Sequence, residues 1–170
     1  MIWLSWVAMR MADSSGPRPG GRYPAELNEA ARLVAERVDD GRHPWSLAYQ
    51  SRSGPPSQRW LEPDVRDHLG DLAKSGTEAV VVIPVGFVSD HMEVRHDLDI
   101  EAAQTADSLG LAFARAATPS TSPRFASMVT ELVTERLALP GGLPGPGDAA
   151  LGDMGVPSQT CPADCCGGTR

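Results

Sequence analysis

The strongest constraint on the fold is an unbroken apolar run at residues 79–85, AVVVIPV, in which most side chains are β-branched. Such side chains favour strands, and a strand that is apolar at every position must be covered on both of its faces. Strands of this kind are typical of parallel sheets with helices packed on either side. The run therefore predicts an α/β fold.

The segments around this run alternate in the way that an α/β fold requires. Helices are predicted where apolar residues recur at three- and four-residue spacing, and strands where short apolar runs end at turn residues. The order is helix, strand, helix, strand, helix, strand, helix, at residues 24–40, 45–50, 63–75, 79–85, 90–109, 111–114 and 122–139. This order predicts a three-layer, Rossmann-like domain with a parallel sheet and right-handed crossovers, whose ligands bind at the carboxyl ends of the strands.

The two ends of the chain differ in composition from this central part. Residues 1–22 begin apolar without periodicity and become rich in Gly, Ser and Pro, so we interpret them as an atypical N-terminal segment and a linker. Residues 23–139 form the predicted domain. Residues 140–170 are dominated by Gly, Pro, Ala and Asp, and we expect a flexible, disordered tail.

Length and charge narrow the classes of partner. The 170 residues allow one domain of ordinary size, and the net charge of −7 argues against binding to nucleic acid or to an anionic membrane. Small molecules or other proteins are the expected partners. No apolar run approaches the ~20 residues of a transmembrane helix, and the first ten residues lack the basic region of a signal peptide. We therefore expect a cytoplasmic protein without a transmembrane segment.

Three carboxylates follow the apolar run at four-residue steps: Glu93, Asp97 and Glu101. Each such step turns an α-helix by only about 40° beyond a full turn, so the three would share one face and suit protons or a hard divalent cation. A plainer interpretation is that Asp90 and Glu93 form a capping box, while Asp97 and Glu101 are solvated and paired with Arg95. Taken alone, the spacing favours this plainer interpretation.

Several motifs, in order along the chain, decide between these interpretations. They are YQSRSGP at residues 49–55, WLEP at 60–63 and IPVGFVSDHME at 83–93, with DLDIE at 97–101. Together they resemble the C-terminal half of a ferrochelatase, most closely the actinobacterial type that inserts iron into coproporphyrin. The resemblance covers residues 12–138. It implies the second of two similar Rossmann-like (chelatase) halves, with the porphyrin held between them.

The resemblance also implies roles for the acidic residues. The function expected is insertion of Fe²⁺ into a porphyrin, most closely coproporphyrin III, in heme biosynthesis. Glu93 matches the family's glutamate that contacts the metal or the porphyrin centre. Asp97 and Glu101 match acids that extend away from it as a path for protons or metal. These three are therefore expected catalytic residues, and Glu93 is the expected metal contact.

Other site residues are assigned by the same resemblance. His91 is expected to act in catalysis, and Asp90 and Trp60 to bind the porphyrin. Residues 50–52 match the family's motif at the end of a strand and are interpreted as organising the loop. Taken alone, His91 would be a structural histidine and Trp60 a core residue. The remaining histidines are interpreted as structural: His43, His68 and His96.

Three cysteines lie near the C-terminus: Cys161, Cys165 and Cys166. Thiols this close together in a cytoplasmic protein suggest metal binding more than a disulfide. The resemblance to actinobacterial ferrochelatases implies a [2Fe–2S] cluster as cofactor. Such clusters normally have four protein ligands, and this chain has no further cysteine. Two interpretations remain open: three plain thiols, or a cluster completed by a non-cysteine ligand, by a second chain or by a segment that is missing here.

The N-terminal half of a ferrochelatase has no counterpart in this sequence. That half would supply one wall of the porphyrin cleft and a histidine that faces Glu93, whereas the first histidine here is His43. We interpret the chain as a truncated form in which residues 1–10 are foreign to the family, and expect little or no iron insertion from it alone. The alternative is a non-catalytic α/β module that binds metal or tetrapyrrole and needs a separate N-terminal half.

Overall fold

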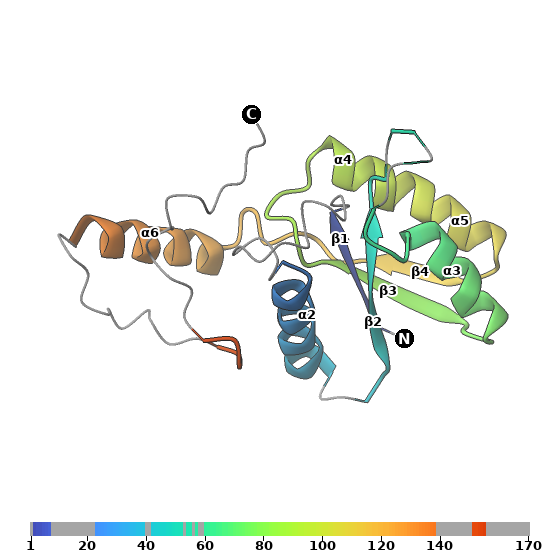
Figure 1. Cartoon of the computed structure of the whole chain (residues 1–170), viewed down its shortest axis with the longest axis horizontal. Helices are drawn as coiled ribbons and strands as arrows, with labels where there is room; N and C mark the ends of the chain where they lie inside the picture. Colours follow the sequence, from blue (N-terminus) through green and yellow to red (C-terminus); the bar gives the residue numbers. More distant parts are fainter. Residues whose placement is uncertain are drawn as a thin grey trace.

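The structure is a computed structural model that describes residues 2–7, 23–39, 42–52, 54–55, 57, 60–138 and 151–155 (Figure 1). Its elements are β1 (Ile2–Val7), α2 (Tyr23–Asp39), β2 (Trp45–Gln50), α3 (Val65–Lys74), β3 (Ala79–Pro84), α4 (Met92–Val94), η2 (Arg95–Ala102), α5 (Ala103–Ser108), β4 (Ala112–Arg115) and α6 (Pro123–Ala138). Strands and helices alternate along the whole described chain, as the sequence predicts from residue 24 onward.

The sheet is parallel, with strand order β2-β1-β3-β4. One of the two inner strands is β1, whose Ile2 pairs with Trp45 of β2 on one side and with Val81 of β3 on the other. The prediction of no regular element before residue 24 was therefore wrong. An inner strand of a parallel sheet has apolar residues without alternation, so its short sequence carries no periodic signal.

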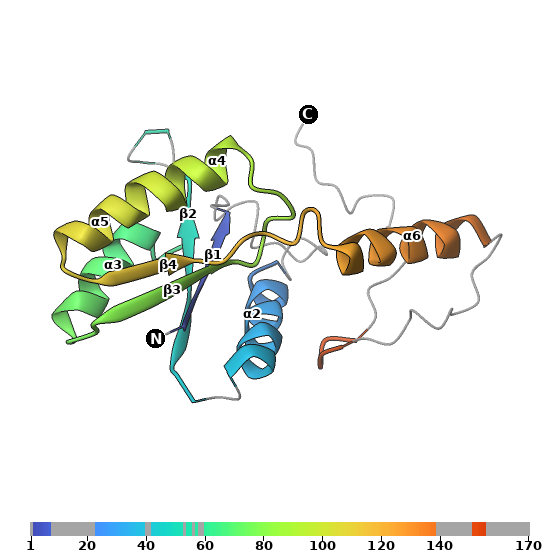
Figure 2. The same ribbon diagram turned by 180° about the vertical axis from the view of Figure 1, so that it is seen from behind.

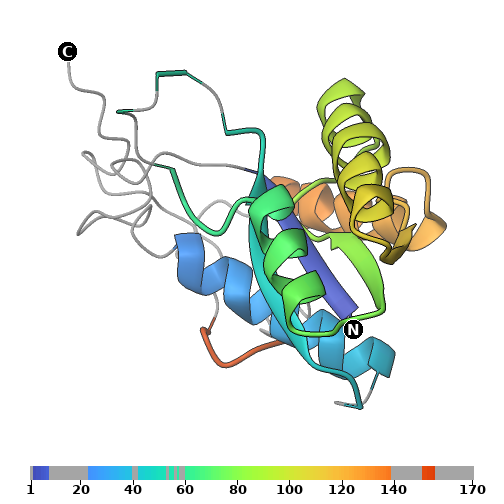
Figure 3. The same cartoon turned by 90° about the vertical axis from the view of Figure 1, so that its right-hand side faces the viewer.

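Helices cover the sheet in a three-layer arrangement (Figures 1 and 3). On one face, α3 and the continuous helical segment α4–η2–α5 pack against each other and against the sheet. Leu69 of α3, Leu98 of η2 and Val82 of β3 are fully buried in this core. Each such side chain contributes about 1.5–3 kcal/mol through removal from water. The predicted three-layer α/β fold with a parallel sheet is confirmed.

The opposite face of the sheet is covered only in part. There α2 packs against β1 and β2, and Leu27 and Ala31 of α2 are buried. In β3, however, Val81 is 38% exposed, so the predicted cover on both faces of this strand is incomplete. The reason is that α6 extends away from the sheet instead of packing on it (Figure 2). Its apolar side chains are exposed: Met128, Val129, Leu132, Val133 and Leu137.

The helix predicted at residues 90–109 forms, but its first turn and its middle differ from the prediction. It begins at Met92, and His91 is the N-cap, with its Nδ1 atom accepting a hydrogen bond from the Val94 amide at 3.5 Å. The capping box of Asp90 and Glu93 was therefore wrong. Residues Arg95–Ala102 form a π-helix, in which each amide bonds a carbonyl five residues back.

The C-terminal region is described only at residues 151–155. The Asp153 amide donates a hydrogen bond of 2.8 Å to Glu29 Oε1 on α2, and Arg32 binds the same glutamate at 2.7 Å. These contacts lower the pKa of Glu29 to about 2, with the Arg32 hydrogen bond as the main cause. The three cysteines lie outside the described residues. Among the described helices, none is both long and apolar enough to cross a membrane.

Candidate metal site

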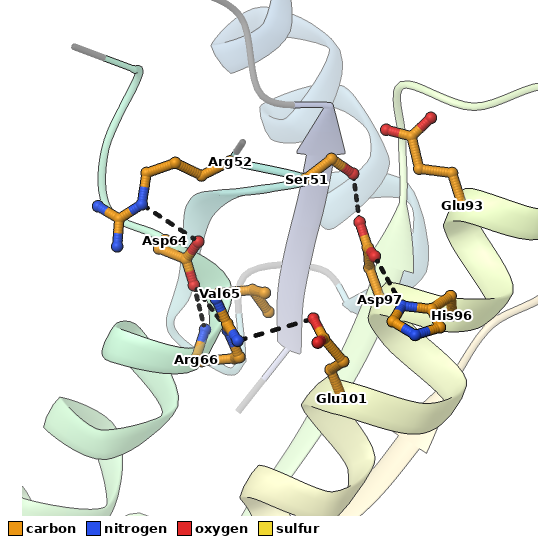
Figure 4. A pocket seen from close by; sticks show the side chains of 9 residues that line it. All are labelled: Ser51, Arg52, Asp64, Val65, Arg66, Glu93, His96, Asp97 and Glu101. Atoms are coloured by element: carbon orange, nitrogen blue, oxygen red, sulfur yellow. Dashed lines mark hydrogen bonds and ion pairs between the residues drawn. The ribbon is translucent and has the colours of Figure 1, made fainter. Parts of the chain in front are cut away.

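A cavity of about 410 Å³ lies at the carboxyl end of β2, between the start of α3 and the α4–η2 segment (Figure 4). Its position agrees with the rule that parallel α/β sheets bind ligands beyond the carboxyl ends of their strands. The described lining consists of Ser51, Arg52, Asp64, Val65, Arg66, Glu93, His96, Asp97 and Glu101. The prediction that Glu93, Asp97 and Glu101 share one face of a helical segment is thereby confirmed.

The π-helical turn helps to align these three carboxylates. In an α-helix a four-residue step overshoots one turn by about 40°, so a row at this spacing drifts around the axis. A π-helical turn contains more residues, which offsets the drift over Arg95–Ala102. Asp97 and Glu101 both lie in this π-helical stretch, one turn after Glu93 and one turn apart.

Ser51 holds Asp97 from the opposite side of the cavity. Its Oγ donates a hydrogen bond to Asp97 Oδ2, and its backbone has φ of 66°, the left-handed region that residues other than glycine seldom adopt. This conformation costs about 1–2 kcal/mol. It places the first residue after β2 where its hydroxyl reaches the helix, so the loop at 50–52 contributes directly to the site.

Two arginines balance part of the negative charge. Arg66 Nη1 lies 3.7 Å from Glu101 Oε2, and Arg52 Nε lies 4.0 Å from Asp64 Oδ2. Asp64 is 5% exposed and caps α3 by accepting a hydrogen bond of 3.0 Å from the Arg66 amide. The lining thus has four carboxylates and two guanidinium groups. With all of them ionised and the histidine neutral, its net charge is negative, which favours a cation.

Glu93 and His96 complete the set of potential ligands. Glu93 makes no hydrogen bond or ion pair with the described part of the chain, so its carboxylate is available to a ligand (Figure 4). His96 Nδ1 lies 3.3 Å from Asp97 Oδ1. One ligand atom each from His96, Asp97 and Glu101 lies within 4.8 Å of the other two. Two carboxylates and one imidazole at this spacing can hold a divalent ion of the first transition series.

Other residues predicted from the sequence lie outside this lining. Asp90 accepts a hydrogen bond of 2.6 Å from Arg115, and the His91 ring stands edge-on to Phe87, with ring centroids 5.0 Å apart. Trp60 is half-buried, and its indole nitrogen has no hydrogen-bond partner among the described residues. The catalytic role of His91 and the porphyrin-binding roles of Asp90 and Trp60 therefore stay predictions.

Four lining residues were not predicted to belong to the site: Asp64, Val65, Arg66 and His96. His96 was interpreted as structural, although its place three residues after Glu93 puts it on the neighbouring part of the same helical face. Arg66 carries no comparable signal, because it approaches Glu101 only through the packing of α3 against η2.

Residues 7–137 match the family model described as Ferrochelatase. The chain belongs to the ferrochelatase family. The match begins at residue 7, so residues 7–10, interpreted above as foreign to the family, are part of it. The family match therefore includes the last residue of the inner strand β1.

Individual relatives carry a more specific name. The chain is 51% identical over 163 residues to the coproporphyrin III ferrochelatase of Frankia alni, covering 94% of this chain and 40% of that protein. It is 47% identical over 162 residues to that of Streptomyces coelicolor, covering 91% and 43% respectively. This ferrochelatase-family chain thus spans less than half the length of these relatives.

A solved structure has a similar fold. A CbiX protein from Marinobacter aquaeolei VT8 aligns with a TM-score of 0.51 at 17% identity, covering 81% of this chain and 98% of that one. At this identity the likeness supports the α/β chelatase fold alone.

Proposed function

We propose that this chain forms the metal-binding wall of a ferrochelatase, and that with the remainder of such an enzyme it inserts Fe²⁺ into coproporphyrin III for heme biosynthesis. The observation that carries the proposal is the convergence of Glu93, Asp97 and Glu101 on one cavity in a chain of this family. The relatives are coproporphyrin III ferrochelatases, which supports coproporphyrin III as the substrate.

The reaction needs both a base and a metal ligand. Fe²⁺ replaces the two pyrrole N–H protons of the porphyrin, so two protons must leave as the metal enters. Glu93 is suited to act at the porphyrin centre because its carboxylate is unpaired within the described chain. A positioned carboxylate can accept a proton or bind the metal through oxygen.

The part of the cavity beside Glu93 is suited to deliver the ion. We assign His96, Asp97 and Glu101 to hold Fe²⁺ before insertion, since their donor atoms are close together. The Ser51 hydroxyl and the Arg66 guanidinium orient the two carboxylates. Partial neutralisation by Arg66 also weakens the hold on the ion, which favours its transfer onward to Glu93.

Three further roles belong to the proposal. His91 is assigned to catalysis and Asp90 and Trp60 to porphyrin binding, on their match to the family's motifs. His91 and Asp90 directly precede the helix that bears Glu93, so they lie near the proposed insertion centre along the chain. The indole N–H of Trp60 is buried without a hydrogen-bond partner among the described residues, and a buried donor of this kind calls for a partner that the porphyrin could supply.

A separate proposal concerns the three cysteines near the C-terminus. Cys161, Cys165 and Cys166 would hold a [2Fe–2S] cluster together with a fourth ligand, because the chain has three cysteines and such clusters take four ligands. That ligand would be a non-cysteine residue or a group from outside this sequence. No step of iron insertion is assigned to this cluster.

The length of the chain favours one alternative to an enzyme that is active by itself. Because it spans 40% of the Frankia alni relative, the chain alone would be a non-catalytic α/β module that binds metal or tetrapyrrole. In that case activity appears only when the rest of a ferrochelatase supplies the opposite wall.

A chimera tests the proposed function. The region of the Frankia alni enzyme that matches this chain is replaced by it, and iron insertion into coproporphyrin III is measured. We expect the chimera to be active and Glu93→Gln to reduce its rate at least about 100-fold, the usual loss on removing a catalytic base. Asp107→Asn, which removes an exposed acid from the same helical segment outside the cavity, is the matched control.

The outcomes separate the two functions. A folded chimera without activity, or with full activity in Glu93→Gln, would contradict the proposed role of this cavity. Turnover by the chain alone would instead show that the remainder of a ferrochelatase is not required.

A further inference from the structure

Arg115 links two segments on either side of Glu93. It is the last residue of β4, and its side chain is only 14% exposed. Its Nε and Nη2 atoms donate to the two carboxylate oxygens of Asp99 at 2.6 and 2.7 Å. Its Nη1 atom donates to Asp90 Oδ1 at 2.6 Å. One guanidinium group therefore binds the loop before α4 and the π-helix η2 at the same time.

This arrangement is stronger than an ordinary surface ion pair. A bidentate, charge-assisted contact fixes both distance and direction, and partial burial limits screening by solvent. The hydrogen bonds that Arg115 donates to Asp99 are the main cause of a raised pKa for the guanidinium group, so the group stays charged throughout the accessible pH range. Arg95 offers a contrast, because it approaches the same Asp99 only at 3.9 Å and is 69% exposed.

The contacts of Arg115 affect the position of Glu93. Glu93 follows Asp90 by three residues and precedes Asp99 by six, and it has no partner of its own in the described chain. The His91 cap, at 3.5 Å, is too long to fix the start of the helix firmly. The side chain of Arg115 thus joins both flanks of Glu93 to the end of β4 through charge-assisted hydrogen bonds.

We propose that Arg115 is a positioning residue that fixes the start of the α4–η2 segment and so sets the place of Glu93 in the cavity. This inference rests on the proposed function. Arg115 itself is not among the residues that line the cavity, so it acts through Asp90 and Asp99.

Cobalt binding tests this role in the chain as it stands. Co²⁺ is a spectroscopic substitute for Fe²⁺, and its visible absorption reports ligand geometry. In Arg115→Gln we expect Co²⁺ affinity to fall about 10- to 100-fold, as for groups that orient metal ligands, with a changed spectrum and little change in the urea midpoint. Arg115→Lys, which retains charge without the bidentate geometry, should be intermediate. Arg95→Gln should resemble the wild-type chain.

The results distinguish failure of the positioning role of Arg115 from failure of the proposed function. Wild-type affinity and spectrum in folded Arg115→Gln would overturn the positioning role. If that variant does not fold, Asp99→Asn decides: reduced Co²⁺ affinity supports the role, and unchanged affinity overturns it. Absence of Co²⁺ binding by the wild-type chain would contradict the proposed function itself and remove the basis of the positioning role.

Discussion

Single residues determine what kind of ion the cavity can hold. A row of carboxylates alone suits hard cations such as Mg²⁺ or Ca²⁺. His96 adds an imidazole nitrogen beside Asp97 and Glu101, and this donor favours transition metals over hard cations. The mixed donor set therefore fits Fe²⁺ better than the three acids of the sequence motif would by themselves.

The sequence predicts which acids share a face of the helical segment, but it does not predict which residues contact them from across the cavity. The four-residue spacing of Glu93, Asp97 and Glu101 indicates one face whether the turn is α or π. Ser51 reaches Asp97 across 46 positions of sequence, and Arg66 reaches Glu101 through the packing of two helices. Such contacts depend on tertiary structure and leave no local pattern.

His68 should make the stability of the fold depend on pH. Burial lowers the pKa of its imidazole, against an opposing effect of Asp71, and its Nε2 atom lies 2.8 Å from Ser46 Oγ on β2. The unfolded chain therefore binds this proton more readily than the folded chain. The contribution of His68 to the free energy of unfolding is complete above about pH 6.5 and falls as the pH decreases toward the lower folded-state pKa.

Urea unfolding at pH 7.5 and pH 5.5 measures this effect. We expect the wild-type chain to lose more stability between these values than His68→Gln, which cannot titrate. An equal loss in the two proteins would show that burial of His68 does not couple protonation to folding.

At the scale of the element, the helical segment that bears the acids depends on its buried face. Leu98 is fully buried in η2 against α3 and β3, whereas Ile100 in the same segment is 47% exposed. Burial on the face opposite the cavity holds the segment against the sheet. The position of the carboxylates therefore depends on packing as well as on their own contacts.

Leu98→Ala should lower the free energy of unfolding by about 2–5 kcal/mol, the usual cost of a large-to-small change in a core. Ile100→Ala, the matched control, should cost less than about 1 kcal/mol because its side chain is already partly in water. The measurement is urea denaturation at neutral pH. Similar costs for both variants would mean that η2 is not packed as described.

Most elements were predictable from their sequence patterns, with exceptions that have physical causes. The β-branched run at 79–85 and the periodic segments identified three strands and four helical segments near their observed places. The strand β1 was missed because its six residues, five of them apolar, do not alternate between apolar and polar. The π-helix was not foreseen because apolar spacing looks the same in α and π turns over so short a stretch, and nothing in the α6 sequence shows that it extends away from the sheet.

At the scale of the whole molecule, the chain presents one wall of a site. The cavity carries net negative charge at a sheet edge, and the curated relatives that name its family extend well beyond its length. Under the proposed function, this wall collects the metal, and the porphyrin lies between it and the second wall. The family resemblance could be inferred from the order of motifs, whereas the metal-binding geometry required the folded chain.

The location of a bound metal tests this account most directly. Crystals of the chain grown with Co²⁺ are measured at the cobalt absorption edge, and the anomalous difference map shows where the ion lies. The account predicts a peak in the cavity, within about 2.3 Å of at least two donor atoms of Glu93, His96, Asp97 and Glu101. A peak bound elsewhere on the chain, or an empty cavity at saturating Co²⁺, would contradict it.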